Sequence, residues 1–476
     1  MALTPVIGVE VHVELLTDSK MFCGCRNEFG GEANSRCCPV CIGLPGSLPV
    51  ANRDAVGLTI LAGLALNCKV LDLARFYRKN YFYPDLCKNY QISQYDEPLT
   101  YDGEIHLNVD GEPVSIGIAR AHLEEDTGKN LHLPDGRTLV DYNRCGVPLM
   151  EVVTKPDFRS AEQVREYLLQ LRRLLRYLGV STANMEEGAM RAEANVNFID
   201  FETGQKTPVI EVKNIGSITN CYNAIRYEIE RQRKEIADGT LPAHRETRRW
   251  DETRNITSPM RQKESADDYM YFPEPDLVPM APEVEWVEEI RASMPELPWD
   301  RERRFVEDLG LPQYDAGVLC ETRAIADYFE AVAGSCSDAK LASNWVMGNV
   351  MATLNERGIG IEDFPVPAEQ IAALIGAVCD GTISNNIAKD VYAKMLETGD
   401  APATIIEREG LRQISDTGEL EALIQAAIEA NPRAVEDFRA GKGKALGAIV
   451  GFVMRETKGQ ANPQLVNDLL IKALGG

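Results

Sequence analysis

IGVEVHVEL, residues 7–15, alternates strictly between apolar and polar side chains. Successive side chains of a β-strand point to opposite faces of the sheet, so this pattern predicts a strand with one buried face and one polar face. The polar face carries Glu10, His12 and Glu14. An ordinary half-exposed strand has the same pattern, so the alternation alone predicts a strand and does not predict a site.

The same alternation returns later in the chain. RAEANVNF, residues 191–198, and VIEVKN, residues 209–214, again separate polar from apolar side chains. Several such strands predict a sheet with carboxylates and amides on one side, which suits Mg²⁺, a cation that prefers oxygen ligands. Scattered surface acids are the alternative. With the acidic segment HLEED, these stretches supply the candidates Glu124, Glu125, Glu193 and Glu211, and the cation Lys213.

The chain is too long for one core, because 476 residues correspond to about three domains of ordinary size. Its first part mixes short alternating segments with a few helices. After a proline-rich change of texture near residue 295 the pattern is almost entirely helical. We therefore expect an α+β fold with domains at residues 1–295, 296–405 and 406–476.

Five cysteines are concentrated in one short stretch. Cys23 and Cys25 form a C-x-C pair, and Cys38 and Cys41 form a second pair around Pro-Val. Two close pairs of thiolates suit tetrahedral zinc, and four thiolates would leave no open position for a substrate. Unliganded thiols are the alternative, and disulfides are disfavoured because the other cysteines are scattered singly. Cys37 is a second candidate beside Cys38, which has the better spacing to Cys41.

The formal net charge of −23 disfavours nonspecific nucleic-acid binding, because the protein as a whole repels polyanions. Residues 431–476 are locally basic, with seven Lys or Arg and four Asp or Glu. This region predicts either a polyanion-binding loop or an ordinary solvated surface.

Several common functions lack their sequence signatures. The chain contains no G-x-x-x-x-G-K-[ST] loop and no G-x-G-x-x-G motif after a strand. The first residues have no basic flank before a long apolar run, and no later stretch approaches the about 20 apolar residues of a membrane span. We therefore expect a cytoplasmic protein without a membrane partner.

Motifs throughout the chain resemble those of one family, the B subunits of the aspartyl/glutamyl-tRNA amidotransferases. The resemblance is ordered and covers essentially the whole chain. The motifs that carry it are IGVEVHVELLTDSKMFCGC, CPVCIGLPGSLPVAN, RKNYFYPD, YQISQYDEP, HLEEDTGK, DYNRCGVPLMEVV, DDYMYFPEPDLVP, SNWVMGNV and GKGKALGAIVGFVM followed by KGQANPQLVN.

This resemblance implies a cradle-shaped catalytic domain on an antiparallel sheet, similar to the catalytic fold of glutamine synthetase. An all-helical domain and a small helical tail domain follow. The implied enzyme binds tRNA(Gln) carrying Glu or tRNA(Asn) carrying Asp. ATP phosphorylates the side-chain carboxylate, and ammonia displaces the phosphate to leave the amide.

The resemblance also implies roles for the polar residues. Catalysis is assigned to Glu10, His12, Glu124, Glu125, Glu193 and Glu211. Nucleotide binding is assigned to Glu10, His12, Glu125 and Lys213, and Mg²⁺ binding to Glu10, His12, Glu125 and Glu193. Structural zinc is assigned to Cys23, Cys25, Cys38 and Cys41. The sequence departs from the family at Glu193, where an R-x-D-A-N pattern usually has Asp.

The implied partners follow from what the chain lacks. It has no Ser-Ser-Lys amidase signature, no G-x-S-x-G motif and no clear Cys-His glutaminase arrangement. The resemblance therefore implies that a separate amidase, the A subunit, releases ammonia from glutamine and that a small C subunit joins the two. Mischarged tRNA would contact Arg439, Lys442, Lys444 and Lys458. The rival hypotheses are a zinc-containing, noncatalytic RNA-binding protein and a metal-dependent hydrolase.

Overall fold

A computed structural model of the chain has a mixed α+β first part and a helical second part. Contacts divide the chain into two units, Met1–Leu297 and Pro298–Gly476. The described residues are 3–260, 270–336, 338–413, 417–439, 442–457, 460–461 and 463–475.

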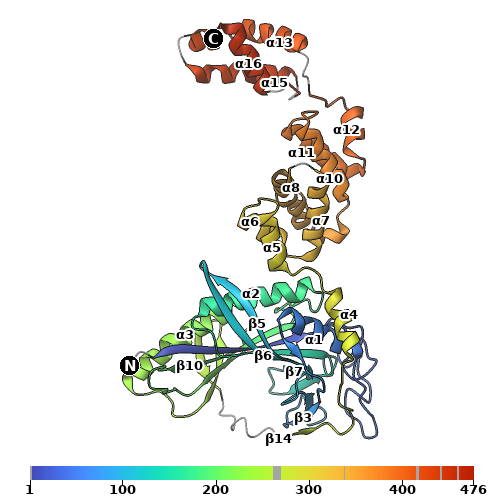
Figure 1. Cartoon of the computed structure of the whole chain (residues 1–476), viewed down its shortest axis with the longest axis vertical. Helices are drawn as coiled ribbons and strands as arrows, with labels where there is room; N and C mark the ends of the chain where they lie inside the picture. The colour runs from blue at the N-terminus through green and yellow to red at the C-terminus, as the bar shows by residue number, and fades with distance from the viewer. Residues whose placement is uncertain are drawn as a thin grey trace. The chain divides into compact units, whose positions relative to one another are not determined.

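A nine-stranded sheet forms the centre of the first unit (Figure 1). Its strand order is β13-β12-β11-β10-β1-β9-β6-β5-β2, and every neighbouring pair is antiparallel except β11 with β12. The strands are β1 (Thr4–Glu14), β2 (Lys69–Val70), β5 (Thr100–Val109), β6 (Glu112–Glu125), β9 (Pro148–Thr154), β10 (Met190–Ile199), β11 (Ile210–Lys213), β12 (Glu246–Asp251) and β13 (Ile256–Pro259).

The predicted first strand is confirmed, and it lies in the middle of the sheet. Strand β1 pairs with β10 on one side and with β9 on the other. Its side chains Val9, Val11 and Val13 are at most 1% exposed. This face is buried, so the opposite face is the one that displays Glu10 and His12.

Helices cover the apolar side of the sheet (Figure 1). Helix α2 (Ala161–Tyr177) begins at Ser160, whose side chain accepts a hydrogen bond from the backbone N–H of Gln163. Its apolar stripe is buried, as the 3.6-residue period predicts. Helices α1 (Arg53–Ala65) and α3 (Ile218–Asp238) also belong to this unit, which ends with α4 (Val284–Ser293).

A smaller sheet packs against β6. It has the order β14-β3-β4, formed by Met270–Pro273, Tyr77–Asn80 and Tyr90–Ser93. Its β4 strand directs Gln91 and Ser93 toward the end of β6, where both donate hydrogen bonds to Glu124. A separate hairpin pairs β7 (Lys129–His132) with β8 (Thr138–Asp141).

The described part of the second unit is helical and contains two hydrophobic cores. One core includes residues from Phe305 to Ile406, and the other includes residues from Leu420 to Leu474. The three-domain division at residues 295 and 405 stays a prediction, because contacts separate only two units. The α-helices are α5 (Pro298–Glu307), α6 (Gln313–Leu319), α7 (Arg323–Gly334), α8 (Ala339–Trp345), α9 (Met351–Arg357), α10 (Ala368–Cys379), α11 (Asn385–Thr398), α12 (Pro402–Arg408), α13 (Thr417–Ala430), α14 (Pro432–Arg439), α15 (Leu446–Glu456) and α16 (Pro463–Leu474).

The described ranges of the second unit also include three short helical turns. They are a π-helical turn at Val346–Val350 and 3₁₀ turns at Ile361–Asp363 and Gly443–Ala445. Within the described ranges, no helix combines the length and the apolar character needed to cross a membrane.

Candidate functional site

Three neighbouring strands place ionisable side chains in one row at the centre of the large sheet. His122 of β6 is directly opposite Glu151 of β9, and Glu151 is directly opposite His12 of β1. The Glu151 Oε2 atom lies 3.2 Å from His122 Nε2 and 3.8 Å from His12 Nε2. Directly opposite residues share a face of the sheet, so the strand register brings these three groups together.

Glu124 joins this row from β6. Its Oε1 atom is 3.4 Å from His122 Nε2, and its Oε2 atom is 3.8 Å from His12 Nε2. The Ser93 hydroxyl donates to Glu124 Oε1 at 2.6 Å, and the Gln91 amide donates to Glu124 Oε2 at 3.1 Å. These contacts fix the carboxylate, whose side chain is buried. Three residues, His12, Glu124 and Glu151, each have a ligand atom within 4.8 Å of those of the other two. We call these three residues the histidine cluster.

Buried charges oppose one another inside the histidine cluster. Burial alone would lower the pKa of His122, but the carboxylates of Glu151 and Glu124 outweigh it and raise that pKa to about 9. Burial alone would raise the pKa of Glu151, but His122 and His12 hold it well below its usual range. At neutral pH, His122 is therefore protonated and Glu151 is ionised. Lys79 of β3 also faces these carboxylates, which raise its pKa against the effect of burial.

A second group of carboxylates lies beside the first. Glu10 of β1 is directly opposite Glu193 of β10, and Glu211 comes from β11. One oxygen from each lies within 4.8 Å of the others, and we call them the glutamate cluster. Lys213 Nζ pairs with Glu193 at 2.5 Å and with Glu211 at 3.1 Å. The Asn195 amide donates to Glu10 at 3.0 Å.

The two clusters share one face of the sheet, because Glu10 and His12 are two residues apart on β1. Burial raises the pKa of Glu10, and repulsion from Glu151, Glu193 and Glu211 raises it further. Glu151 belongs to the histidine cluster, so its effect on Glu10 shows that the clusters are electrostatic neighbours. A divalent cation would relieve this repulsion, and the oxygen-rich donor set fits Mg²⁺.

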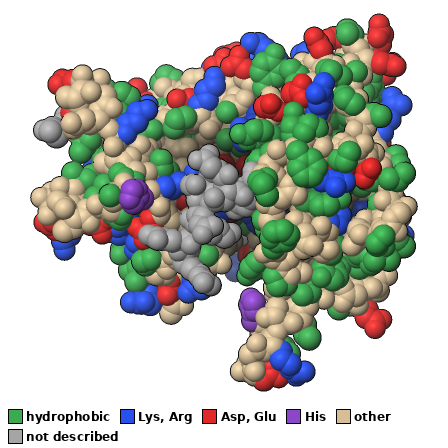
Figure 2. Space-filling view, turned by 90° about the horizontal axis from the view of Figure 1, so that it is seen from below, with side chains coloured by type: hydrophobic (Ala, Val, Ile, Leu, Met, Phe, Trp, Pro, Cys, Tyr) green, Lys and Arg blue, Asp and Glu red, His purple; other side chains and the backbone are tan. Residues whose placement is uncertain are grey.

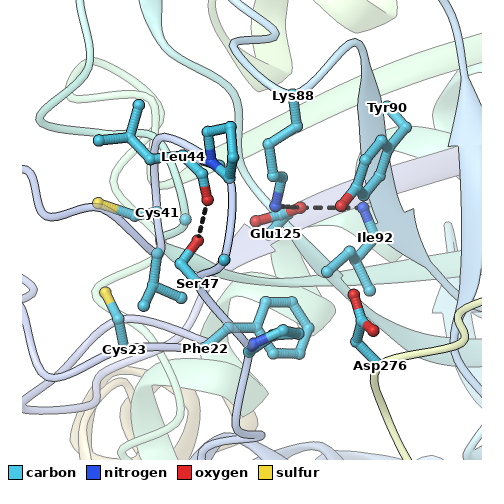
Figure 3. A pocket seen from close by; sticks show the side chains of 16 residues that line it. Phe22, Cys23, Cys41, Leu44, Ser47, Lys88, Tyr90, Ile92, Glu125 and Asp276 are labelled. Carbon is cyan, nitrogen blue, oxygen red and sulfur yellow. Dashed lines mark hydrogen bonds and ion pairs between the residues drawn. The ribbon is translucent and has the colours of Figure 1, made fainter.

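Glu125 is separated from both clusters although it follows Glu124 in sequence. Its carboxylate forms an ion pair with Lys88 and accepts a hydrogen bond from the backbone N–H of Ile92 at 3.0 Å. It lines a cavity of about 180 Å³, with Cys41 and Cys23 at one side and Lys88, Tyr90 and Glu125 at the other (Figure 3). The family resemblance assigns Glu125 to the magnesium ligands, whereas in the structure its carboxylate pairs with Lys88 and, among the described residues, belongs to neither cluster.

A third ionic group lies at the end of β1. Asp126 pairs with Arg191, and Arg144 Nε lies 3.4 Å from Asp126 Oδ2. Glu14 faces this group. Burial, followed by repulsion from Asp126, raises the pKa of Glu14 to about 7, although Arg191 and Arg144 act in the opposite direction. Glu14 therefore titrates near neutral pH.

The four predicted zinc ligands converge. The sulfur atoms of Cys23, Cys25, Cys38 and Cys41 lie within 4.8 Å of one another, and Cys37 is not in this group among the described residues. Tetrahedral Zn–S bonds of about 2.3 Å place sulfurs about 3.8 Å apart, so this cysteine cluster fits zinc. A hydrogen bond from Cys23, together with the backbone N–H of Cys38 and the charge of Lys20, lowers the pKa of Cys41 against the effect of burial.

Three of the four predicted tRNA contacts lie near the end of α14. Arg439, Lys442 and Lys444 are exposed. Lys442 Nζ forms an ion pair with Asp437 at 2.9 Å, which reduces its availability to a phosphate. Lys458 lies outside the described residues.

Sequence reasoning did not single out three residues of the site: His122, Glu151 and Lys79. His122 and Glu151 each had a detectable signal, since each is an ionisable residue within a strand whose neighbours are mostly apolar. Buried ionisable groups are rare without partners, so their position inside such strands predicts a functional or ion-paired role. Lys79 has no comparable signal in the mixed segment YRKN.

Two family models match the chain. The GatB/GatE catalytic domain matches residues 5–288, and the GatB domain matches residues 327–474. The chain belongs to the GatB family. The first match contains the histidine, glutamate and cysteine clusters, and the second contains the exposed cations near α14.

Relatives of this GatB-family chain extend over its whole length. The B subunit of the aspartyl/glutamyl-tRNA(Asn/Gln) amidotransferase of Caldanaerobacter subterraneus subsp. tengcongensis is 49% identical over 469 residues, or 98% of each chain. The protein of the same name from Carboxydothermus hydrogenoformans is 50% identical and covers 98% of this chain and 97% of its own. The one from Chlorobium phaeobacteroides is 48% identical over 99% of each chain.

Proposed function

We propose that this chain is the B subunit of a tRNA-dependent amidotransferase. It converts Glu on tRNA(Gln), Asp on tRNA(Asn), or both, into the amide. ATP phosphorylates the side-chain carboxylate, and ammonia then displaces the phosphate. The observation that carries this proposal is the pair of neighbouring acidic clusters on one face of the sheet, in a chain whose relatives bear the name of that enzyme over nearly their full length.

In this proposal both clusters hold magnesium. The ligands in the histidine cluster are His12, Glu124 and Glu151. The ligands in the glutamate cluster are Glu10, Glu193 and Glu211. When bound, magnesium neutralises charge on the phosphoryl group being transferred. Glu125 is left out of these ligand sets because, among the described residues, its carboxylate belongs to neither group of converging ligand atoms. The departure from the family's Asp at Glu193 is compatible with this role, because the Glu193 carboxylate reaches the cluster.

The chain's own cations complement the proposed chemistry. Lys79 faces the histidine cluster, and Lys213 lies within the glutamate cluster. Both are positioned to offset negative charge where ATP and a carboxylate meet. Protonated His122 lies behind Glu124 and Glu151 and orients them through contacts of 3.4 Å and 3.2 Å. His122 is thus a positioning residue.

The sheet is proposed to form the cradle of a glutamine synthetase-like catalytic domain. The cysteine cluster is proposed to hold zinc in a structural role, because four thiolates fill a tetrahedral shell and leave no position for substrate. Removing zinc should therefore affect folding before it affects chemistry.

The remaining parts of the enzyme are proposed to be separate chains, an amidase A subunit and a small C subunit. Hydrophobic side chains gather over one half of the face of the molecule seen in Figure 2, and such surface suits protein contacts. Several large apolar residues of the first unit are strongly exposed, namely Phe29, Leu48, Val50, Phe82 and Val278.

Mischarged tRNA is proposed to contact the basic tail through Arg439, Lys442, Lys444 and Lys458. Acidic and basic side chains are interspersed over the face in Figure 2, so the net charge of −23 does not form a single acidic surface there. A local group of cations can then bind a polyanion while the whole chain discourages nonspecific binding.

The test is transamidation by the assembled complex, with ATP, glutamine or ammonia, and each mischarged tRNA in turn. Amide formation coupled to ATP cleavage is expected with at least one tRNA. Glu151→Gln should abolish most of this activity, whereas the matched control Glu104→Gln, an exposed residue of β5, should not change it. A noncatalytic RNA-binding protein would show no ATP cleavage, and a metal-dependent hydrolase would turn over without partner chains.

A further inference from the structure

Two cysteines outside the proposed zinc ligands lie in contact with each other. Cys87 and Cys145 are 58 residues apart in sequence, and their sulfur atoms are 3.4 Å apart. Both thiols donate to the same acceptor, the backbone carbonyl of Cys41, at 3.4 Å and 3.1 Å. The shared acceptor holds both sulfurs on one side of the Cys41 peptide and keeps them facing each other.

The backbone around this thiol pair is firmly held. Lys20 Nζ donates to the carbonyl of Cys145 at 2.7 Å, and the Cys145 N–H donates to the carbonyl of Tyr142 at 3.0 Å. On the other side, Lys88 follows Cys87 directly and pairs with Glu125. The two cysteines are thus pre-positioned, and bond formation needs the sulfurs to approach by about 1.4 Å, to the ~2.05 Å of a disulfide.

The cavity of Figure 3 lies beside the thiol pair, although neither Cys87 nor Cys145 lines it. Its lining includes Cys41, whose carbonyl accepts both hydrogen bonds. It also includes Lys88, which follows Cys87, and Gly146, which follows Cys145. Cys145 is 3% exposed, whereas Cys87 is partly exposed. Cys87 is therefore the sulfur that meets an oxidant first, and Cys145 is the one that resolves the product.

We infer that Cys87 and Cys145 form a reversible intramolecular disulfide when the protein meets a peroxide, a modification site distinct from the zinc ligands. Hydrogen peroxide transfers one oxygen to the Cys87 sulfur, which gives a sulfenic acid and one water. The Cys145 sulfur then attacks the Cys87 sulfur. The S–S bond forms, the S–O bond breaks, and the hydroxyl leaves with the Cys145 proton as a second water. The two thiols lose two electrons, and the peroxide gains them.

The bond would join two loops that support the proposed active site. Cys87 precedes β4, whose Gln91 and Ser93 hold Glu124. Cys145 precedes β9, which carries Glu151. A dithiol reductant would reopen the bond by thiol–disulfide exchange.

The test is timed oxidation of the full-length, zinc-loaded protein by hydrogen peroxide, followed by acid quenching, denaturation, alkylation and peptide mass spectrometry. We expect a peptide pair linked through Cys87 and Cys145, formed about tenfold faster than thiols are lost at Cys68 and Cys221, because peroxide reaches the partly exposed Cys87 more readily and the intramolecular second step does not limit the rate. Those two controls are buried cysteines. Dithiothreitol should restore both alkylation sites.

Single variants separate the two steps. In Cys145→Ser, Cys87 should accumulate as a sulfenic acid that dimedone traps, and in Cys87→Ser, Cys145 should remain a free thiol. The inference is overturned if Cys87 and Cys145 stay alkylatable while zinc is released and the cysteine cluster oxidises. It is also overturned if either residue links to a different cysteine.

Discussion

His122 offers a direct test of the charge arrangement in the site, because its pKa is the consequence of buried contacts with Glu124 and Glu151. The difference between a pKa of 6.5 and one of about 9 corresponds to about 3 kcal/mol of stabilisation of the protonated imidazole in the folded protein. His122 is fully buried, so solvent does not screen these contacts appreciably. We expect His122→Gln to remove this contribution.

The sign of the pH dependence follows from the raised pKa. The stabilisation is complete below pH 6.5, the value for the unfolded chain, and it is lost as the pH rises through about 9. The difference in free energy of unfolding between the native protein and His122→Gln should therefore shrink by about 3 kcal/mol between pH 6 and pH 10. Urea unfolding of the zinc-loaded protein at several pH values, in buffer prepared without magnesium, measures it.

Histidine NMR gives an independent measurement, because the chain has only five histidines. One labelled imidazole resonance, absent from His122→Gln, should titrate at about pH 9. His106→Gln is the matched control, since the His106 side chain is 69% exposed and its loss should leave the pH dependence of unfolding unchanged. A His122 resonance that titrates at or below pH 6.5 would refute the proposed contacts with ionised Glu124 and Glu151.

Four further changes test other parts of the molecule. Glu193→Ala should lower ATP-dependent activation by about 10²-fold in a transamidation assay and leave tRNA affinity within twofold; unchanged activation would remove this residue from the site. Glu14→Gln should stabilise the protein by about 1 to 3 kcal/mol at pH 8 but not at pH 4. The raised pKa of Glu14, about 7, means that its ionised form is unfavourable in the folded protein. Equal effects on urea unfolding at both pH values would contradict this. Cys41→Ser should remove zinc from the purified protein and lower its melting temperature, and full zinc retention would exclude this ligand. Replacing both Lys442 and Lys444 with Glu should weaken tRNA binding and flatten its salt dependence, and an unchanged slope in filter binding would argue against a tail contact.

Alternation alone could predict which side chains of the first strand share a face. The pattern of residues 7–15 identified the face that carries Glu10 and His12, and the structure places both in clusters. Alternation says which face a residue occupies, but it does not say which strands are neighbours. The row from His122 to Glu151 to His12 depends on pairing between residues as far as 139 positions apart, from 12 to 151, which no local pattern encodes.

Glu125 is a second case in which a local sequence pattern does not predict the contacts of a side chain. The family resemblance assigned it to catalysis together with Glu124, although adjacent residues of a strand point to opposite faces. Its partner, Lys88, comes from a loop in a different part of the sequence, so no local pattern predicts this ion pair. The cysteine cluster was predictable because its ligands lie close together in sequence, so its spacing is a local property.

The central place of β1 has a consequence for the order of events during synthesis. Thr4–Glu14 leaves the ribosome first, but its partner β9 begins at Pro148 and β10 begins at Met190. The ribosome adds a further 176 residues, from 14 to 190, before β10 begins to appear, which takes about 9 to 35 s at ~5–20 residues per second. Until β9 is made, β1 has neither of its neighbouring strands, and until β10 follows it has only one. Long-range pairing of this kind is slow to form. The strand that carries Glu10 and His12 is thus the first to be made, and it gains its second neighbour only after about 190 residues have been synthesised.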